Sequence, residues 1–89
     1  MKLSELKLEG FEYDSNTSGN CGEVYFNHVS NPDDEFICFI PDMDADDRII
    51  ITVSKSCQYV YVSALTGNEI DPDFIAVTVA TLKKKYLDD

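Results

Sequence analysis

The chain has 89 residues, a mass of 10.0 kDa and a formal net charge of −10 at pH 7. This length has room for one hydrophobic core, so we expect a single domain over residues 1–89. Five Tyr and five Phe residues exclude a disordered acidic tail, because such tails lack the apolar groups that offset chain entropy. No run of about 18 apolar residues occurs, so we expect no membrane-spanning helix.

The cysteines and the first residues bear on the compartment. Cys21, Cys38 and Cys57 are odd in number and widely spaced, without the C-x-x-C pair of a zinc or redox motif. Residues 1–10 contain no continuous apolar stretch of the kind that signal peptides carry. We therefore expect reduced thiols and a cytoplasmic protein.

The net negative charge belongs to one half of the chain. Residues 1–47 contain twelve Asp and Glu against Lys2 and Lys7, a net charge of −10, whereas residues 48–89 contain five acids and five bases. A field of this sign repels nucleic acid and anionic membranes and favours encounter with basic proteins. We expect no direct contact with nucleic acid or membrane.

Two strands are expected in the first third of the chain. Residues 6–9 alternate apolar with charged, and the alternation resumes with shifted phase at residues 11–13, which predicts a strand with a bulge at Gly10. A short helix at the start is the alternative. Residues 14–22 are a polar loop, and residues 23–29 are rich in strand formers.

Three further strands are expected in the middle of the chain. Residues 36–40 (FICFI) are a short apolar run typical of a strand that is buried on both faces, and it follows a turn. Residues 48–53 and 58–64 are separated by a short polar link and look like a hairpin.

The last segment has features of both a strand and a helix. Ile75, Val77 and Val79 alternate like a strand, but Asp71 is a good helix N-cap and Pro72 suits the first helical turn. The helix predicts a buried stripe of Phe74, Ile75, Thr78, Val79, Leu82 and Tyr86. The expected fold is therefore α+β, a small antiparallel sheet of about five strands in hairpin order with one C-terminal helix packed on one face.

Residues 42–47 (DMDADD) match the opening D-x-D-x-D of a calcium-binding loop. The match fails where such loops need a turn glycine and a bidentate glutamate, because Asp47 and Val53 stand there. A solvated hairpin tip is the simpler interpretation. We expect no metal ligands and no cofactor, and calcium binding is the weakest alternative.

The aspartates also suit a charge array that imitates nucleic acid. In an extended segment, residues two apart lie about 6.6 Å from each other on one side, which is the order of the spacing between successive phosphates. Asp42, Asp44 and Asp46 have this spacing. A second acidic turn, residues 33–35, lies at the other end of the apolar run, roughly 20 Å away.

Tyr59 and Tyr61 alternate with Val60 and Val62, so one of the two pairs should face outward. Outward tyrosines are typical anchors of protein interfaces, although an ordinary solvent-facing row is the alternative. The candidate partner-binding residues are Asp33, Asp34, Glu35, Asp42, Asp44, Asp46, Asp47, Tyr59 and Tyr61.

We expect no enzymatic activity, because no phosphate-binding, nucleophile-elbow or metalloprotease motif occurs. His28 shares a face of its strand with Val24 and Phe26, so a partly buried, hydrogen-bonded role is expected. A nucleophilic pairing with Cys21 or Cys38 is an alternative without positive support.

In size and charge the chain resembles phage-encoded inhibitors of bacterial defence, of the anti-CRISPR, anti-restriction or DNA-mimic type, and small immunity proteins. The resemblance implies an inhibitor that docks its acidic surface on a basic, nucleic-acid-binding site of a partner protein. The alternative is an accessory or structural subunit, or an immunity-type protein, whose acidity keeps it soluble.

Overall fold

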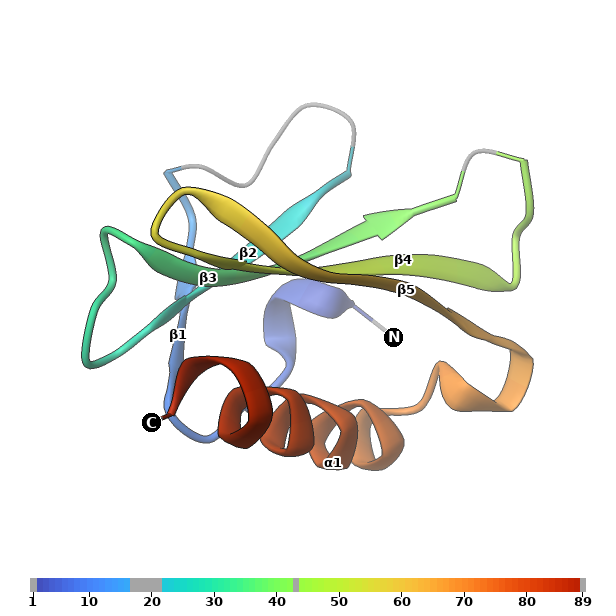
Figure 1. Cartoon of the computed structure of the whole chain (residues 1–89). Coiled ribbons are helices and arrows are strands. Elements are labelled where there is room, and N and C mark those ends of the chain that lie inside the picture. Colours follow the sequence, from blue (N-terminus) through green and yellow to red (C-terminus); the bar gives the residue numbers. More distant parts are fainter. Residues whose placement is uncertain (1, 17–21, 43, 89) are drawn as a thin grey trace.

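In the computed structural model, which describes residues 2–16, 22–42 and 44–88, five strands form one antiparallel sheet in chain order. Figure 1 shows the helix α1 on one side of this sheet, together with the N-terminal segment. The predicted α+β class, the hairpin order and the C-terminal helix are confirmed. The elements are β1 (Phe11–Asp14), β2 (Val24–His28), β3 (Glu35–Pro41), β4 (Arg48–Lys55), β5 (Gln58–Thr66) and α1 (Pro72–Leu82).

The core lies between the sheet and α1. Residues that pair directly across antiparallel strands share a face, and the row Phe26, Ile37 and Val53 is fully shielded from solvent. Such burial stabilises the fold by about 1.5–3 kcal/mol for each large apolar side chain. The buried cluster consists of Leu8, Phe11, Phe26, Ile37, Phe39, Ile49, Ile51, Val53, Leu65, Ile75, Val79, Leu82 and Leu87.

The ends of α1 follow the local chemistry of the sequence. The Asp71 carboxylate accepts a hydrogen bond from the Phe74 backbone N–H at 3.1 Å, and Pro72 occupies the first turn. Ile75, Val79 and Leu82 are buried as predicted, and the helix continues into a π-turn over Lys83–Leu87. Phe74 is exposed, contrary to the predicted stripe, because it lies one position off the row that faces the sheet.

The predicted strand over residues 6–9 is wrong. A short 3₁₀ helix spans Leu3–Glu5, as the alternative had it, and Leu8 is buried below the sheet. Gly10 makes a turn, not a bulge: its φ is +84°, and its carbonyl accepts a hydrogen bond from the Val29 N–H. The leucines alternate like those of a strand, but they pack on the core instead of pairing at the edge of the sheet.

The hairpin between β4 and β5 is longer and more irregular than expected. Ser56 and Cys57 form a two-residue turn in which both φ angles are positive, the geometry that matches the twist of hairpin strands. Ser54 pairs with Tyr59, whereas Val53 pairs with Tyr61, so Val60 is an extra residue. This bulge turns the two tyrosines toward opposite faces of the sheet.

Candidate functional site

The open face of the sheet, which points away from α1, is not covered by any helix in the part of the chain that the structure describes (Figure 1). Its central row runs through the paired residues Tyr25, Cys38, Thr52 and Val62. Cys38 and Thr52 are buried, whereas Val62 is exposed. By strand alternation and pairing the open face comprises Glu12, Asp14, Tyr25, Asn27, Phe36, Cys38, Ile40, Arg48, Ile50, Thr52, Ser54, Tyr59, Val62, Ala64 and Thr66.

The two acidic turns lie at opposite ends of β3, as predicted. β3 has seven residues, so its ends are separated by roughly 20 Å. Asp33 and Asp34 are exposed in the turn before β3. In the loop after β3 the exposed carboxylates are those of Asp44, Asp46 and Asp47.

Asp42 braces its own loop. Its carboxylate accepts hydrogen bonds from the Asp44 N–H at 2.8 Å and from Arg48 Nε at 2.6 Å, and its side chain is only 12% exposed. The Asp44 N–H, and then the Arg48 side chain, hold the pKa of this carboxyl below its usual value. Asp42 therefore orders the acidic loop and presents little surface to a partner.

Glu35 lies inside the molecule and not in the solvated turn. It is the first residue of β3, it is 8% exposed, and its Oε2 lies 3.8 Å from His28 Nδ1. His28 Nδ1 accepts a hydrogen bond from the Ser30 N–H at 3.1 Å, and Nε2 lies 3.1 Å from Asp88 Oδ1. Since a backbone N–H only donates, Nδ1 is the acceptor and Nε2 carries the proton. The predicted buried, hydrogen-bonded role of His28 is confirmed.

The structure separates His28 from Cys38. His28 lies on the face of β2 that also carries Phe26, whereas Cys38 pairs with Tyr25 on the open face. Burial raises the pKa of the Cys38 thiol, which disfavours the nucleophilic thiolate. A Cys38–His28 pairing is therefore wrong, and Cys21 lies outside the described residues.

The two candidate tyrosines occupy different environments. Tyr59 is 67% exposed on the open face. Tyr61 is partly buried on the side of α1, where its ring centroid lies 5.4 Å from that of Tyr86. The prediction that the two face the same way is wrong, because the bulge at Val60 places their side chains on opposite faces of the sheet. The alternation in the sequence does not reveal this bulge.

The structure brings together two carboxylates that the sequence had left apart. A hollow of about 410 Å³ at the open face is lined by Asp14, Tyr25, Asn27, Pro32, Asp33 and Phe36. Sequence reasoning missed Asp14, because it was assigned to the polar loop after β1. The alternation of Glu12 and Asp14 with Phe11 and Tyr13 was the available signal.

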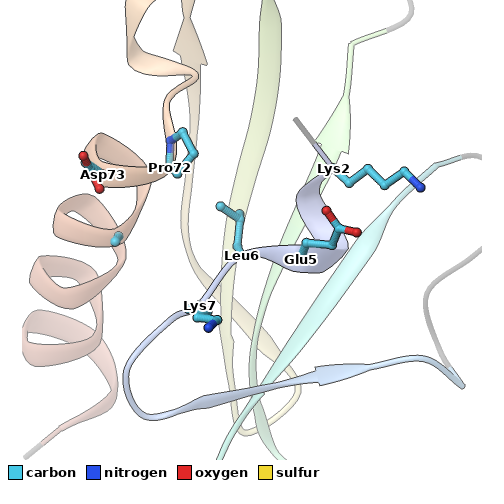
Figure 2. A pocket seen from close by; sticks show the side chains of 7 residues that line it. Lys2, Glu5, Leu6, Lys7, Pro72 and Asp73 are labelled. Carbon is cyan, nitrogen blue, oxygen red and sulfur yellow. The ribbon is translucent and has the colours of Figure 1, made fainter.

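A second hollow, of about 520 Å³, lies between the N-terminal segment and α1. Figure 2 shows Leu6 pointing toward α1, whereas the charged ends of Lys2 and Asp73 point away from each other. The lining contains both positive and negative side chains, but their charged groups do not converge on one point. A ligand site needs such convergent polar groups. In residues 2–16, 22–42 and 44–88, no three His, Cys, Asp or Glu side chains are placed to hold a metal ion.

None of the helices that the structure describes has the length and apolar character to cross a membrane. Comparison with known proteins gives no matching family model, no matching curated protein and no matching solved structure.

Proposed function

We propose that this chain is a non-enzymatic protein-binding module that docks its acidic surface on a basic, nucleic-acid-binding site of a partner protein and so acts as an inhibitor of the charge-mimic type. The proposal places it in the cytoplasm, beside nucleic-acid enzymes of bacterial defence or DNA processing. In this proposal the chain binds a partner protein directly and contacts neither nucleic acid nor membrane.

The observation that carries the proposal is the placement of exposed carboxylates. Asp33 and Asp34 at one end of β3, and Asp44, Asp46 and Asp47 at the other, are exposed. The separation of roughly 20 Å lets one extended basic groove meet both clusters. Because opposite charges at an interface mainly raise the association rate and select the partner, such a complex should be strongly sensitive to salt.

The test begins with affinity capture from a cell lysate at low and high salt, after which the retained protein is identified by mass and purified. A labelled DNA or RNA duplex is then competed against the chain for this partner. Inhibition by mimicry requires mutual displacement and a steep loss of affinity with salt. A complex that is indifferent to salt and tolerates the duplex would instead favour the accessory-subunit alternative.

Matched variants separate the acidic clusters from bulk charge. The triple change Asp33→Asn, Asp44→Asn and Asp46→Asn removes three exposed carboxylates from the two clusters and spares the loop brace Asp42. The control removes three exposed carboxylates from the side of α1, by Glu5→Gln, Glu9→Gln and Asp73→Asn. We expect the first variant to weaken the complex at least about tenfold and the control about twofold or less. Equal losses would refute a specific contact surface.

A further inference from the structure

The geometry points to the hollow between Asp14 and Asp33 as a socket for an arginine side chain of the partner. This inference deepens the proposed function, on which it rests, because it names the chemical group that anchors the docked protein. It concerns a site that lies on the open face of the sheet, beside the first acidic turn.

The walls of the socket are aromatic. The rings of Tyr25 and Phe36 lie 5.5 Å apart between centroids and are tilted by 59°. Both side chains are half-buried on the sheet and line the hollow, so their rings are restrained by their neighbours. A guanidinium group stacks on such rings through cation–π attraction, and the gain increases where water is excluded.

The carboxylates come from two separate elements. Asp14 ends β1, and Asp33 lies in the turn before β3, next to Pro32. Asp14 is held in position, because Oδ1 accepts from the Asn16 N–H at 3.0 Å and Oδ2 accepts from Asn27 Nδ2 at 2.9 Å. The Asp33 carboxylate is exposed, so it can accept from an incoming N–H donor. The site is preorganised before the cation arrives.

These features select arginine among the groups of a basic surface. Two carboxylates at one hollow repel phosphate and other anions. A lysine ammonium is compact and strongly hydrated, whereas the planar guanidinium is weakly hydrated and donates in a fork to carboxylates while it stacks. The aromatic walls therefore discriminate between the two cations.

The experiment uses the full chain and a small probe, so it does not depend on a partner. N-acetyl-arginine amide is titrated into isotopically labelled protein, and amide and aromatic chemical shifts are followed by NMR, with the lysine and citrulline analogues as comparisons. We expect shifts centred on Tyr25, Asn27 and Phe36, and an affinity for arginine at least about threefold above that for lysine. Citrulline, which has the same shape without charge, should not bind.

Asp33→Asn and Asp34→Asn are the matched variants, because they make the same charge change at adjacent exposed positions and only Asp33 lines the hollow. Asp33→Asn should weaken arginine binding about fivefold, and Asp34→Asn about twofold or less. Phe36→Leu should remove the preference for arginine over lysine if its amide spectrum remains that of the folded chain.

Equal effects of the two Asn changes, or shifts spread evenly over all acidic residues, would overturn the socket. Such a result leaves the proposed function standing if the captured partner still competes with nucleic acid. Conversely, the arginine probe could bind specifically while the captured partner does not compete with nucleic acid. That result would refute the proposed function and leave the socket standing.

Discussion

Asp88 ties the C-terminal end of the chain to β2 through His28, whose Nε2 lies 3.1 Å from Asp88 Oδ1. The other oxygen of the same carboxylate accepts a hydrogen bond from Lys83 Nζ at 2.9 Å. Lys83, and then His28, hold the pKa of the Asp88 carboxyl below its ordinary value of 3.8. One carboxylate thus connects the strand, the π-turn and the chain end.

This arrangement predicts a pH-dependent contribution to stability. Because the folded-state pKa of Asp88 is lowered, its contribution is fully present above the unfolded value and is lost as the pH falls through the folded value. Asp88→Asn should lower the midpoint of thermal unfolding at pH 7, and this effect should shrink as the pH falls below the ordinary value of 3.8. Asp44→Asn, an equal change of charge in the loop after β3, is the control. A difference between Asp88→Asn and the parent that does not shrink as the pH falls below 3.8 would contradict the assignment.

The turn between β4 and β5 predicts a stabilising substitution. Cys57 has a φ of +66°, in the left-handed region that costs a side-chain-bearing residue about 1 kcal/mol. Cys57→Gly should therefore raise the free energy of unfolding by about 1 kcal/mol, measured by urea denaturation. Cys57→Ser removes the thiol and keeps the strain, so it should leave stability unchanged. A stabilisation by serine as large as that by glycine would assign the effect to the thiol.

The bulge at Val60 predicts opposite sensitivities for two neighbouring tyrosines. Tyr61 packs on Tyr86 beside the core, so Tyr61→Ala should cost about 2 kcal/mol of unfolding free energy. Tyr59 is exposed on the open face, so Tyr59→Ala should cost about 0.5 kcal/mol or less. Equal costs in chemical denaturation would mean that the register at the bulge is incorrect.

A comparison of alanine substitutions at Gly10 and Gly67 distinguishes the cost of backbone strain from the cost of a close side-chain contact. A Cβ at Gly10 would overlap with the Lys83 Cε, whereas a Cβ at Gly67 would meet no atom within 4 Å. Both residues have positive φ, so each change to Ala costs about 1 kcal/mol in backbone strain. Gly10→Ala should cost a few tenths of a kcal/mol more than Gly67→Ala, because the flexible Lys83 side chain, which donates to Asp88, must also shift. Thermal and urea unfolding should rank Gly10→Ala below Gly67→Ala, and the reverse order would exclude the contact.

The elements that the sequence predicts correctly are those with local causes. Asp71 and Pro72 start α1 through capping and a fixed φ, which need no distant partner. The apolar run of β3 is recognisable because a strand buried in the middle of a sheet excludes polar side chains. Turn residues then account for the order of the remaining strands.

The errors concern features that only tertiary contacts determine. Leu6 and Leu8 have the spacing of a strand, but packing below the sheet prevails over pairing at its edge. In the sequence Glu35 belongs to a polar turn, but in the structure it is buried beside His28 of the neighbouring strand. The hollow at Asp14 and Asp33 depends on strand register and on a turn that folds back, neither of which composition encodes.

The topology has one more consequence for the acidic half. β5, like β1, is an edge strand of the described sheet, and its residues Gln58–Thr66 (QYVYVSALT) include no charged side chain. Such an edge is a template for intermolecular strand addition and, in many proteins, for fibre growth. A net charge of −10 on each copy opposes that encounter, and the opposition disappears near pH 4.2, where the charge vanishes. We therefore expect the carboxylates of the first half to oppose association of separate copies of the chain along β5.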